Sequence, residues 1–230
     1  MRPTQPPPGT EPVVVARAAG VAGGELVLRR AGRHFEIISN GVFLMDTRDG
    51  ASEREMVRAA LAALPEERIG VRVLIGGLGV GFSAREALDH ARVGHVRVIE
   101  LEPRVIEWHG DHLAPVAGHL LEDPRCEVVC ADFVRWLEGT AETFDAVCLD
   151  IDNGPGWTVV ESNGRLYESA ALDRLAQTVR PDGALAFWSA MPAPDFAGLL
   201  RRRFGAVEEI EVPARHGGPD VLYLTRPGSL

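Results

Sequence analysis

The sequence has few of the residues that would crosslink a secreted domain or span a bilayer. Only three cysteines occur among 230 residues, and none of them forms a CxxC pair. Cys126 and Cys130 would lie about 13 Å apart on an extended strand, too far for a disulfide, so we expect buried, reduced thiols. No apolar run reaches the roughly 18 residues of a membrane helix, and the first residues lack the apolar stretch of a signal peptide. These absences predict a cytoplasmic protein without a membrane partner.

Basic residues are also in deficit, with 24 Lys and Arg against 33 Asp and Glu and a formal net charge of −9. Such a chain repels polyphosphate backbones at long range, so nucleic acid is not an expected partner. Arg201-Arg202-Arg203 follows apolar residues at helical spacing, which predicts a solvated face near a helix C-terminus. His109, His112 and His119 fall within one predicted helix, where we expect a solvated face and no metal site.

Three regions differ in their patterning. Residues 1–12 are proline-rich and polar, which predicts a disordered tail. In residues 13–50, short β-like runs alternate with glycine turns and predict a small antiparallel sheet, with Asn40-Gly41 as a hairpin turn. In residues 51–230, fully apolar strands alternate with helices, which predicts an α/β domain around a parallel sheet.

The α/β region opens with Ser52 and Glu55, which are spaced as a helix capping box. We expect seven strands, at 71–75, 96–100, 126–131, 146–150, 184–189, 208–212 and 221–225. We expect the later helices at about 83–91, 103–120, 133–138, 165–179 and 195–204. Five strand–helix units followed by a final strand pair predict a seven-stranded sheet whose last pair is antiparallel. This arrangement is typical of the Rossmann-like fold of class I S-adenosylmethionine-dependent methyltransferases.

Ligands of open parallel sheets bind beyond the carboxyl ends of the strands. The first strand ends in the glycine-rich turn 76–81, where absent side chains let the backbone approach a ligand. The second ends at Glu100, which is 21 residues after Gly79 and can accept hydrogen bonds from ribose hydroxyls. The third ends in Asp132-Phe133. The carboxylate could bind the amino group of adenine, and the ring or main chain beside it could pack against the face of adenine. The predicted nucleotide-binding residues are Gly76, Gly77, Gly79, Gly81, Glu100, Leu101, Asp132, Phe133 and Asp150.

Two carboxylates, Asp150 and Asp152, follow the fourth strand and are the candidate catalytic residues. Either could be the base, and a helix-capping role is the alternative for both. Trp157 and Tyr167 are candidate walls of the substrate pocket. The alternatives are a partly buried loop aromatic for Trp157 and a core helix residue for Tyr167.

A nicotinamide-binding enzyme is a rival interpretation of the same turn. Gly79, Gly81 and Ala84 are spaced as GxGxxA, and an acid follows about 20 residues later. A dehydrogenase usually needs a second half-sheet or a substrate domain, but only about 80 residues follow Asp150. The acids at the third and fourth strand tips would also have no function there, so we favour an adenosyl sulfur nucleotide.

The sequence resembles the spermidine synthase (polyamine aminopropyltransferase) family from about Glu25 to the C-terminus. Residues 40–56 align without a gap to the family pattern DGVVQLTERDEFIYHEM. Residues 98–103 resemble the pattern VEIDP, 123–125 resemble DPR and 180–183 resemble KPGG. The resemblance implies S-adenosylmethionine or its decarboxylated form as the nucleotide, a small-molecule acceptor and a homodimer.

The chain departs from the family pattern where that family binds amines. Leu44 replaces a glutamine, Glu53-Arg54 replaces a tyrosine–histidine pair, and Gly79 replaces an aspartate that engages the amine of the donor. A desolvated ammonium needs carboxylate or carbonyl acceptors, which leucine and glycine side chains do not supply. The sequence therefore predicts a small-molecule transferase, most simply a methyltransferase. An aminopropyltransferase and a non-catalytic nucleotide-binding protein are the alternatives.

Overall fold

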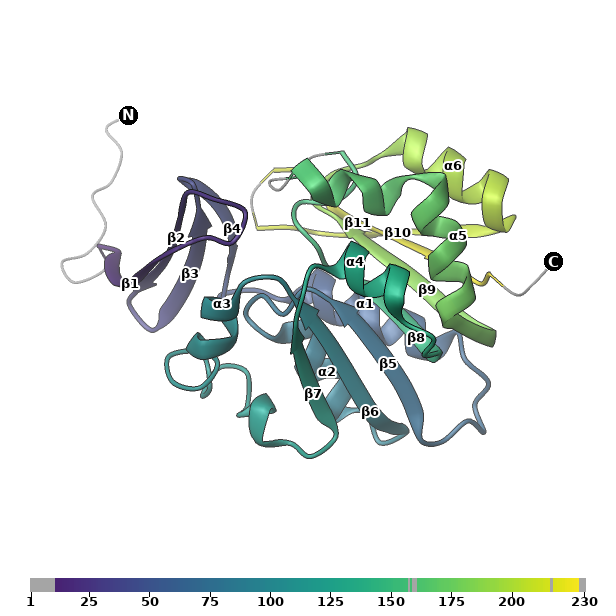
Figure 1. Cartoon of the computed structure of the whole chain (residues 1–230), viewed down its shortest axis with the longest axis horizontal. Coiled ribbons are helices and arrows are strands. Elements are labelled where there is room, and N and C mark those ends of the chain that lie inside the picture. Colours follow the sequence, from purple (N-terminus) through teal and green to yellow (C-terminus); the bar gives the residue numbers. More distant parts are fainter. Residues whose placement is uncertain (1–10, 157, 159–160, 216, 228–230) are drawn as a thin grey trace. The chain divides into compact units, whose positions relative to one another are not determined.

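The computed structural model describes residues 11–156, 158, 161–215 and 217–227. The prediction for Trp157 and most of the predicted tail 1–12 lie outside these residues. The chain divides after Asp49 into two compact units, which are described separately below (Figure 1).

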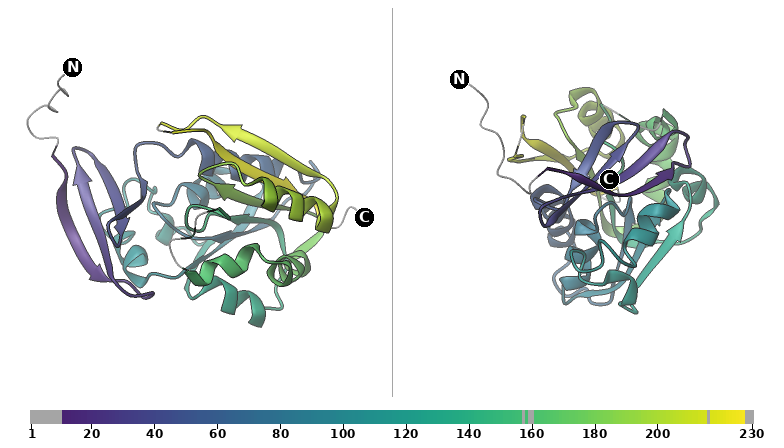
Figure 2. Two further views of the ribbon diagram at one scale, coloured as in Figure 1. Left: turned by 90° about the horizontal axis from the view of Figure 1, so that it is seen from above. Right: turned by 90° about the vertical axis from the view of Figure 1, so that its left-hand side faces the viewer.

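The first unit contains a four-stranded antiparallel sheet (Figure 2). Its strands, in spatial and chain order, are β1 (Val13–Ala19), β2 (Glu25–Ala31), β3 (His34–Ser39) and β4 (Val42–Asp46). Asn40 and Gly41 both have left-handed backbone angles, with φ of 51° and 79°. Two consecutive positive φ angles match the twist of a tight hairpin, so the predicted turn at Asn40-Gly41 is confirmed.

The second unit is built on a seven-stranded sheet in the order β10-β11-β9-β8-β5-β6-β7. Its strands are β5 (Val71–Gly76), β6 (Val93–Glu100), β7 (Cys126–Cys130), β8 (Phe144–Leu149), β9 (Val179–Ser189), β10 (Val207–Val212) and β11 (Asp220–Thr225). β11 pairs antiparallel with both β9 and β10, whereas β5 to β9 are parallel. The predicted seven-stranded sheet with an antiparallel final pair is therefore confirmed.

Helices cover both faces of this sheet. They are α1 (Ala51–Ala62), α2 (Phe82–Asp89), α3 (Pro103–Trp108), α4 (Phe133–Gly139), α5 (Ser169–Thr178) and α6 (Pro194–Phe204), with short 3₁₀ helices at Leu120–Glu122 and Glu161–Tyr167. Figure 1 shows α4, α5 and α6 in front of the sheet and α1 and α2 behind it. Strands covered on both faces are mostly apolar, and all six residues of β8 are buried, with Asp145 its one charged residue.

The predicted helix at 103–120 is wrong, because α3 ends at Trp108. Turns follow it, and both Gly118 and His119 have positive φ angles, which an α-helix does not accommodate. Pro115 also removes a main-chain donor. The three histidines therefore do not share a helix.

The predicted capping box at Ser52 is also wrong, because the N-cap of α1 is Gly50. The Ser52 hydroxyl instead accepts a hydrogen bond from Trp188 Nε1 at 2.9 Å and lies 2.6 Å from Asp220 Oδ2. The Ser52 side chain therefore bonds to residues far along the chain and does not cap the helix as the local spacing predicts.

The predictions for the arginine run and for the cysteines are confirmed only in part. Arg201, Arg202 and Arg203 lie in the last turn of α6, as predicted. Cys148 is buried, but Cys130 is exposed, so the expectation of buried thiols is wrong for that residue. None of the helices in the described residues is long and apolar enough to cross a bilayer.

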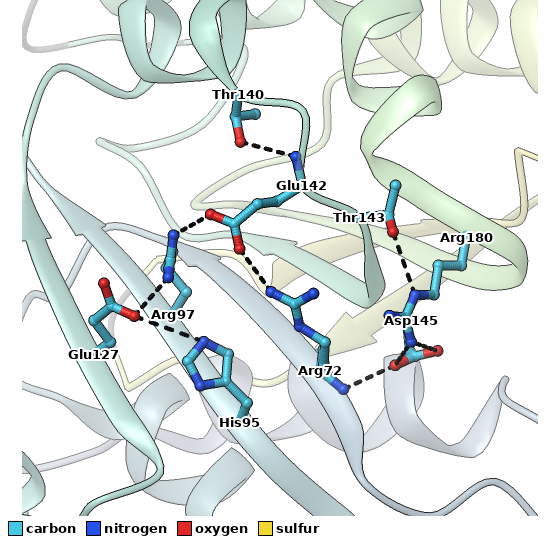
Figure 3. A network of polar contacts seen from close by, with 9 residues as sticks. All are labelled: Arg72, His95, Arg97, Glu127, Thr140, Glu142, Thr143, Asp145 and Arg180. Carbon is cyan, nitrogen blue, oxygen red and sulfur yellow. Dashed lines mark hydrogen bonds and ion pairs between the residues drawn. The ribbon is translucent and has the colours of Figure 1, made fainter.

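A network of charged side chains links the parallel strands of the sheet (Figure 3). Glu142 pairs with Arg72 at 2.7 Å and also with Arg97, which contacts Glu127. Asp145 is 2% exposed and pairs with Arg68 at 3.0 Å and Arg180 at 3.2 Å. It also accepts the Arg72 main-chain N–H at 2.8 Å. Asp145 is thus the most deeply buried carboxylate of this network.

Candidate functional site

The glycine-rich turn lies between β5 and α2, at the centre of the sheet. Gly77 has a φ of 89°, and a Cβ there would lie 2.1 Å from the carbonyl oxygen of Asp150. Gly76 is less tightly confined, since its Cβ would lie 2.9 Å from the side chains of Leu149 and Ile151. The turn therefore requires glycine, because it packs directly against the tip of β8.

Glu100 ends β6 beside this turn and is 8% exposed. Its carboxylate accepts hydrogen bonds from the N–H of Leu78 at 2.7 Å and of Glu102 at 2.8 Å. Burial raises the pKa of Glu100, and the main-chain donors of Glu102 and Leu78 oppose that shift. A carboxylate has about four acceptor positions, so Glu100 can accept these bonds and still accept hydrogen bonds from ribose hydroxyls.

The residues predicted to hold adenine lie at the tips of β6 and β7. Asp132 is the N-cap of α4 and accepts the N–H of Arg135 at 3.0 Å, a capping role that the sequence analysis did not predict for it. Phe133 is 5% exposed and belongs to the hydrophobic core, 3.0 Å from a Cβ placed on Gly76. The carbonyl of Leu101 lies 3.9 Å from the Cys130 sulfur. Their roles toward a nucleotide remain predictions.

Asp150 follows β8 directly, and its main-chain N–H donates to Gly76 at 2.9 Å. The hydroxyl of Ser83, in the first turn of α2, donates to its carboxylate at 3.0 Å. Removal from water raises the pKa of Asp150 to about 8, and the negative charges of Glu53, Asp220 and Glu100 add to the shift. A carboxyl group that titrates near neutrality can accept a proton at physiological pH.

The acidic residues around Asp150 come from three elements, with Glu53 on α1, Asp150 after β8 and Asp220 at the start of β11. Ser52 lies between two of them, with its hydroxyl 3.0 Å from Glu53 Oε2 and 2.6 Å from Asp220 Oδ2. We call Glu53, Asp150 and Asp220 the acidic cluster. Such a concentration of carboxylates favours a cationic ligand.

The Arg54 side chain packs against residues of α2. Its guanidinium carbon lies 4.1 Å from the ring centroid of Phe82, and its Nε lies 4.0 Å from Glu86 on α2. Of the two residues that replace the tyrosine–histidine pair, Glu53 thus adds to the raised pKa of Asp150, and Arg54 stacks on the ring of Phe82.

Asp152 and Tyr167 support the loop that follows β8. Asp152 has a φ of 54° and accepts a hydrogen bond from the Asn163 amide at 2.8 Å. Tyr167 is 8% exposed, packs edge-on to Phe196 and donates to the carbonyl of Ile151 at 3.1 Å. The structure thus places Tyr167 in the core, the alternative considered for it above. Its role as a pocket wall remains a prediction.

His109 was missed as a site residue. It is 2% exposed, against the expected solvated face, and its Nε2 lies 2.9 Å from the carbonyl oxygen of Gly79. Burial lowers its pKa. No local pattern indicates this contact, since 30 residues separate the partners. Among the described residues, no group of three or more His, Cys, Asp or Glu side chains is placed to hold a metal ion.

The sheet order, the glycine-rich turn and the acid at the tip of β6 define a class I methyltransferase-like fold, the class predicted from the sequence. Residues 52–192 match the model of the spermine/spermidine synthase domain. Because this match covers more than half of the chain, the protein belongs to the spermine/spermidine synthase family, as the resemblance implied.

Curated relatives include aminopropyltransferases from two bacteria. The chain is 29% identical over 169 residues to polyamine aminopropyltransferase 2 of Ralstonia nicotianae, covering 73% of this chain and 32% of that protein. It is 31% identical over 186 residues to polyamine aminopropyltransferase of Mycobacterium tuberculosis, covering 79% and 34%. The chain therefore spans about a third of the length of these relatives.

Solved structures share the fold at low sequence identity. A spermidine synthase in complex with the transition state analogue AdoDATO superposes with a TM-score of 0.79 and 18% identity, over 94% of this chain and 74% of that chain. Human methyltransferase-like protein 13 in complex with SAH gives a TM-score of 0.59 and 17% identity, over 76% and 82%. The family match and the curated relatives favour the aminopropyltransferase alternative and do not support the methyltransferase interpretation that the sequence analysis preferred.

Proposed function

We propose that the protein is an aminopropyltransferase that binds decarboxylated S-adenosylmethionine beside the glycine-rich turn and transfers the aminopropyl group to an amine acceptor. The acidic cluster is the observation that carries this proposal. Glu53 on α1 and Asp220 on β11, joined by Asp150 once it is ionised, provide the negative field that a polyamine cation needs, and Arg54 contacts Phe82 and Glu86.

The residues of the turn fit such a nucleotide. Gly76 and Gly77 bring the main chain of β5 against the tip of β8, and Glu100 keeps its carboxylate at the turn by bonding to Leu78 and Glu102. In this proposal Glu100 holds the ribose and Asp132 the adenine amino group. The bound donor would supply an electrophilic carbon next to its sulfonium sulfur.

Asp150 is the proposed base. The acceptor nitrogen forms a bond to the aminopropyl carbon as the carbon–sulfur bond breaks and its electron pair passes to sulfur, which becomes a neutral thioether. The proton released from nitrogen goes to the Asp150 carboxylate. Holding the two reactants together provides much of the rate of such a transfer. The raised pKa makes Asp150 a better proton acceptor than an ordinary aspartate.

The relatives named polyamine aminopropyltransferase and the spermidine synthase bound to AdoDATO support this assignment. A homodimer and a cytoplasmic location remain predictions that follow from the resemblance and the composition.

Methyl transfer to an amine is a second candidate, and Gly79 favours it. Glycine has no carboxylate for the free amine of a decarboxylated donor, which would leave a desolvated ammonium poorly paired at this point of the turn. The acidic cluster serves a cationic acceptor in both reactions. Only the group transferred separates the two candidates.

The deciding experiment incubates the purified protein with putrescine or spermidine and either nucleotide, followed by mass spectrometry of the products. We expect an aminopropyl addition with decarboxylated S-adenosylmethionine and tighter binding of that nucleotide by calorimetry. A methylated amine with S-adenosylmethionine would establish the second candidate. Tight nucleotide binding without any product from amine, phenol or carboxylate acceptors would indicate a non-catalytic binding protein.

Nucleotide binding itself is tested at Glu100. Glu100→Gln loses the charge that strengthens hydrogen bonds to ribose hydroxyls, so we expect the Kd for 5′-methylthioadenosine to rise by about tenfold to hundredfold. The measurement is isothermal titration calorimetry. Glu107→Gln, on the exposed surface of α3, is the matched control and should bind like the original protein. Equal affinity of both variants would remove Glu100 from the nucleotide site.

A further inference from the structure

His109 lies just after the end of α3, and its ring packs against the glycine-rich turn. Its Nε2 lies 2.9 Å from the Gly79 carbonyl oxygen, and its Cε1 would lie 2.8 Å from a Cβ placed on Gly81. The side chain is 2% exposed. The imidazole thus fills the space beside two glycines of the turn and bonds to the carbonyl of one of them.

This hydrogen bond fixes the protonation of the ring. A carbonyl oxygen can only accept, so Nε2 must carry the proton and donate. Within the described residues, Nδ1 is buried and has no hydrogen-bond partner. A second proton there would be desolvated without an acceptor, and burial accordingly lowers the pKa of His109. The ring is therefore neutral, with its hydrogen on Nε2.

Fixing the Gly79 carbonyl also fixes the next N–H. The peptide bond is planar and trans, so the C=O of Gly79 and the N–H of Val80 point in opposite directions. Glycine at position 79 has a φ of 51° and lacks the Cβ that would restrict rotation of this peptide. A glycine-rich turn needs an external contact to hold one peptide orientation.

We propose that His109 is a positioning residue that locks the Gly79–Val80 peptide in the orientation required for nucleotide binding. This inference rests on the proposed nucleotide site. Glu100 holds the preceding segment of the turn through the N–H of Leu78, and His109 holds the following segment through the carbonyl of Gly79. The two side chains come from different elements, so the turn is held from two directions before any ligand arrives.

The test compares His109→Leu, which preserves apolar packing and removes the donor, with His109→Gln, whose amide can still donate to Gly79. We expect His109→Leu to raise the Kd for 5′-methylthioadenosine about tenfold and His109→Gln to raise it less than threefold. The KM for the nucleotide should rise in His109→Leu, whereas kcat at saturating nucleotide should change less. His112→Gln, on the more exposed neighbouring histidine, is the control and should behave like the original protein.

Nuclear magnetic resonance tests the same claim without a nucleotide. The nitrogen shifts of His109 should report a neutral ring protonated at Nε2, and the Val80 amide should exchange with solvent at least tenfold faster in His109→Leu than in His109→Gln. A ring protonated at Nδ1, or equal exchange in the two variants, would overturn the proposal. Failure of the original protein to bind the nucleoside would refute the proposed function, and the magnetic resonance results would still decide the role of His109.

Discussion

Asp150→Asn is expected to lower kcat/KM at pH 8 by a factor of about 10² to 10⁴, the usual contribution of a positioned general base. The asparagine keeps the shape of the side chain but cannot take the proton from the acceptor nitrogen. Because the pKa of Asp150 is raised to about 8, the activity of the original protein should rise with pH up to that region and then level off. Steady-state rates between pH 6 and 9.5 measure both effects.

Two further variants sharpen this prediction. Asp152→Asn removes the carboxylate that accepts the Asn163 amide, and we expect a much smaller loss of activity. Ser83→Ala removes a hydrogen bond that stabilises the charged form of Asp150, so the pKa should rise and the activity profile should move to higher pH. A larger loss in Asp152→Asn than in Asp150→Asn would assign the base to Asp152.

The Asp150→Asn variant should be more stable than the original protein at alkaline pH. An aspartate has a pKa of about 3.9 in an unfolded chain, whereas folding raises that of Asp150 to about 8. The folded state therefore holds a proton that the unfolded state releases, so this group lowers stability progressively as the pH rises from about 4 to 8. Asparagine has no charge to bury.

Thermal unfolding of Asp150→Asn tests this expectation. At pH 8.5 we expect a Tm about 3 °C higher than that of the original protein, and the difference should shrink toward pH 5. A lower Tm of the variant at every pH would show that the carboxylate stabilises the fold and would argue against its placement as a destabilised functional group.

Asp145→Ala is expected to destabilise the protein by about 3 to 5 kcal/mol. Asp145 is 2% exposed and pairs with Arg68 and Arg180, and its removal leaves two guanidinium groups and the Arg72 main-chain N–H without their acceptor. For a chain of this size the loss corresponds to a decrease in Tm of roughly 10 °C. Urea and thermal unfolding measure it.

Glu142→Ala is the matched control within the same network (Figure 3). The Glu142 side chain is 36% exposed and pairs with Arg72 and Arg97, so we expect a loss of about 1 kcal/mol. High salt should reduce the effect of Glu142→Ala more than that of Asp145→Ala, because water and ions screen the exposed pairs. Equal losses in both variants would contradict the role given to burial.

The strand pattern of the large sheet could be predicted because all six residues of β8, like most of β5, are buried. Apolar runs of this kind stay visible in sequence. The helix after β6 could not be predicted correctly, since apolar spacing continues past Trp108 although Gly110 and Pro115 follow. The capping box failed for a different reason, because Asp220 and Trp188 approach Ser52 only after the sheet has formed.

The sequence by itself determined the fold class, the Asn40-Gly41 hairpin, the glycine-rich turn and the acids at the strand tips, Glu100 at the end of β6 and Asp150 after β8. These features depend on local backbone preferences and on side-chain burial, both of which leave periodic patterns along the chain. The tertiary structure alone decided that Glu53 and Asp220 surround Asp150 and that His109 bonds to Gly79. Those groups meet only when strands and helices distant in sequence pack together, and no local pattern records which way their side chains then point.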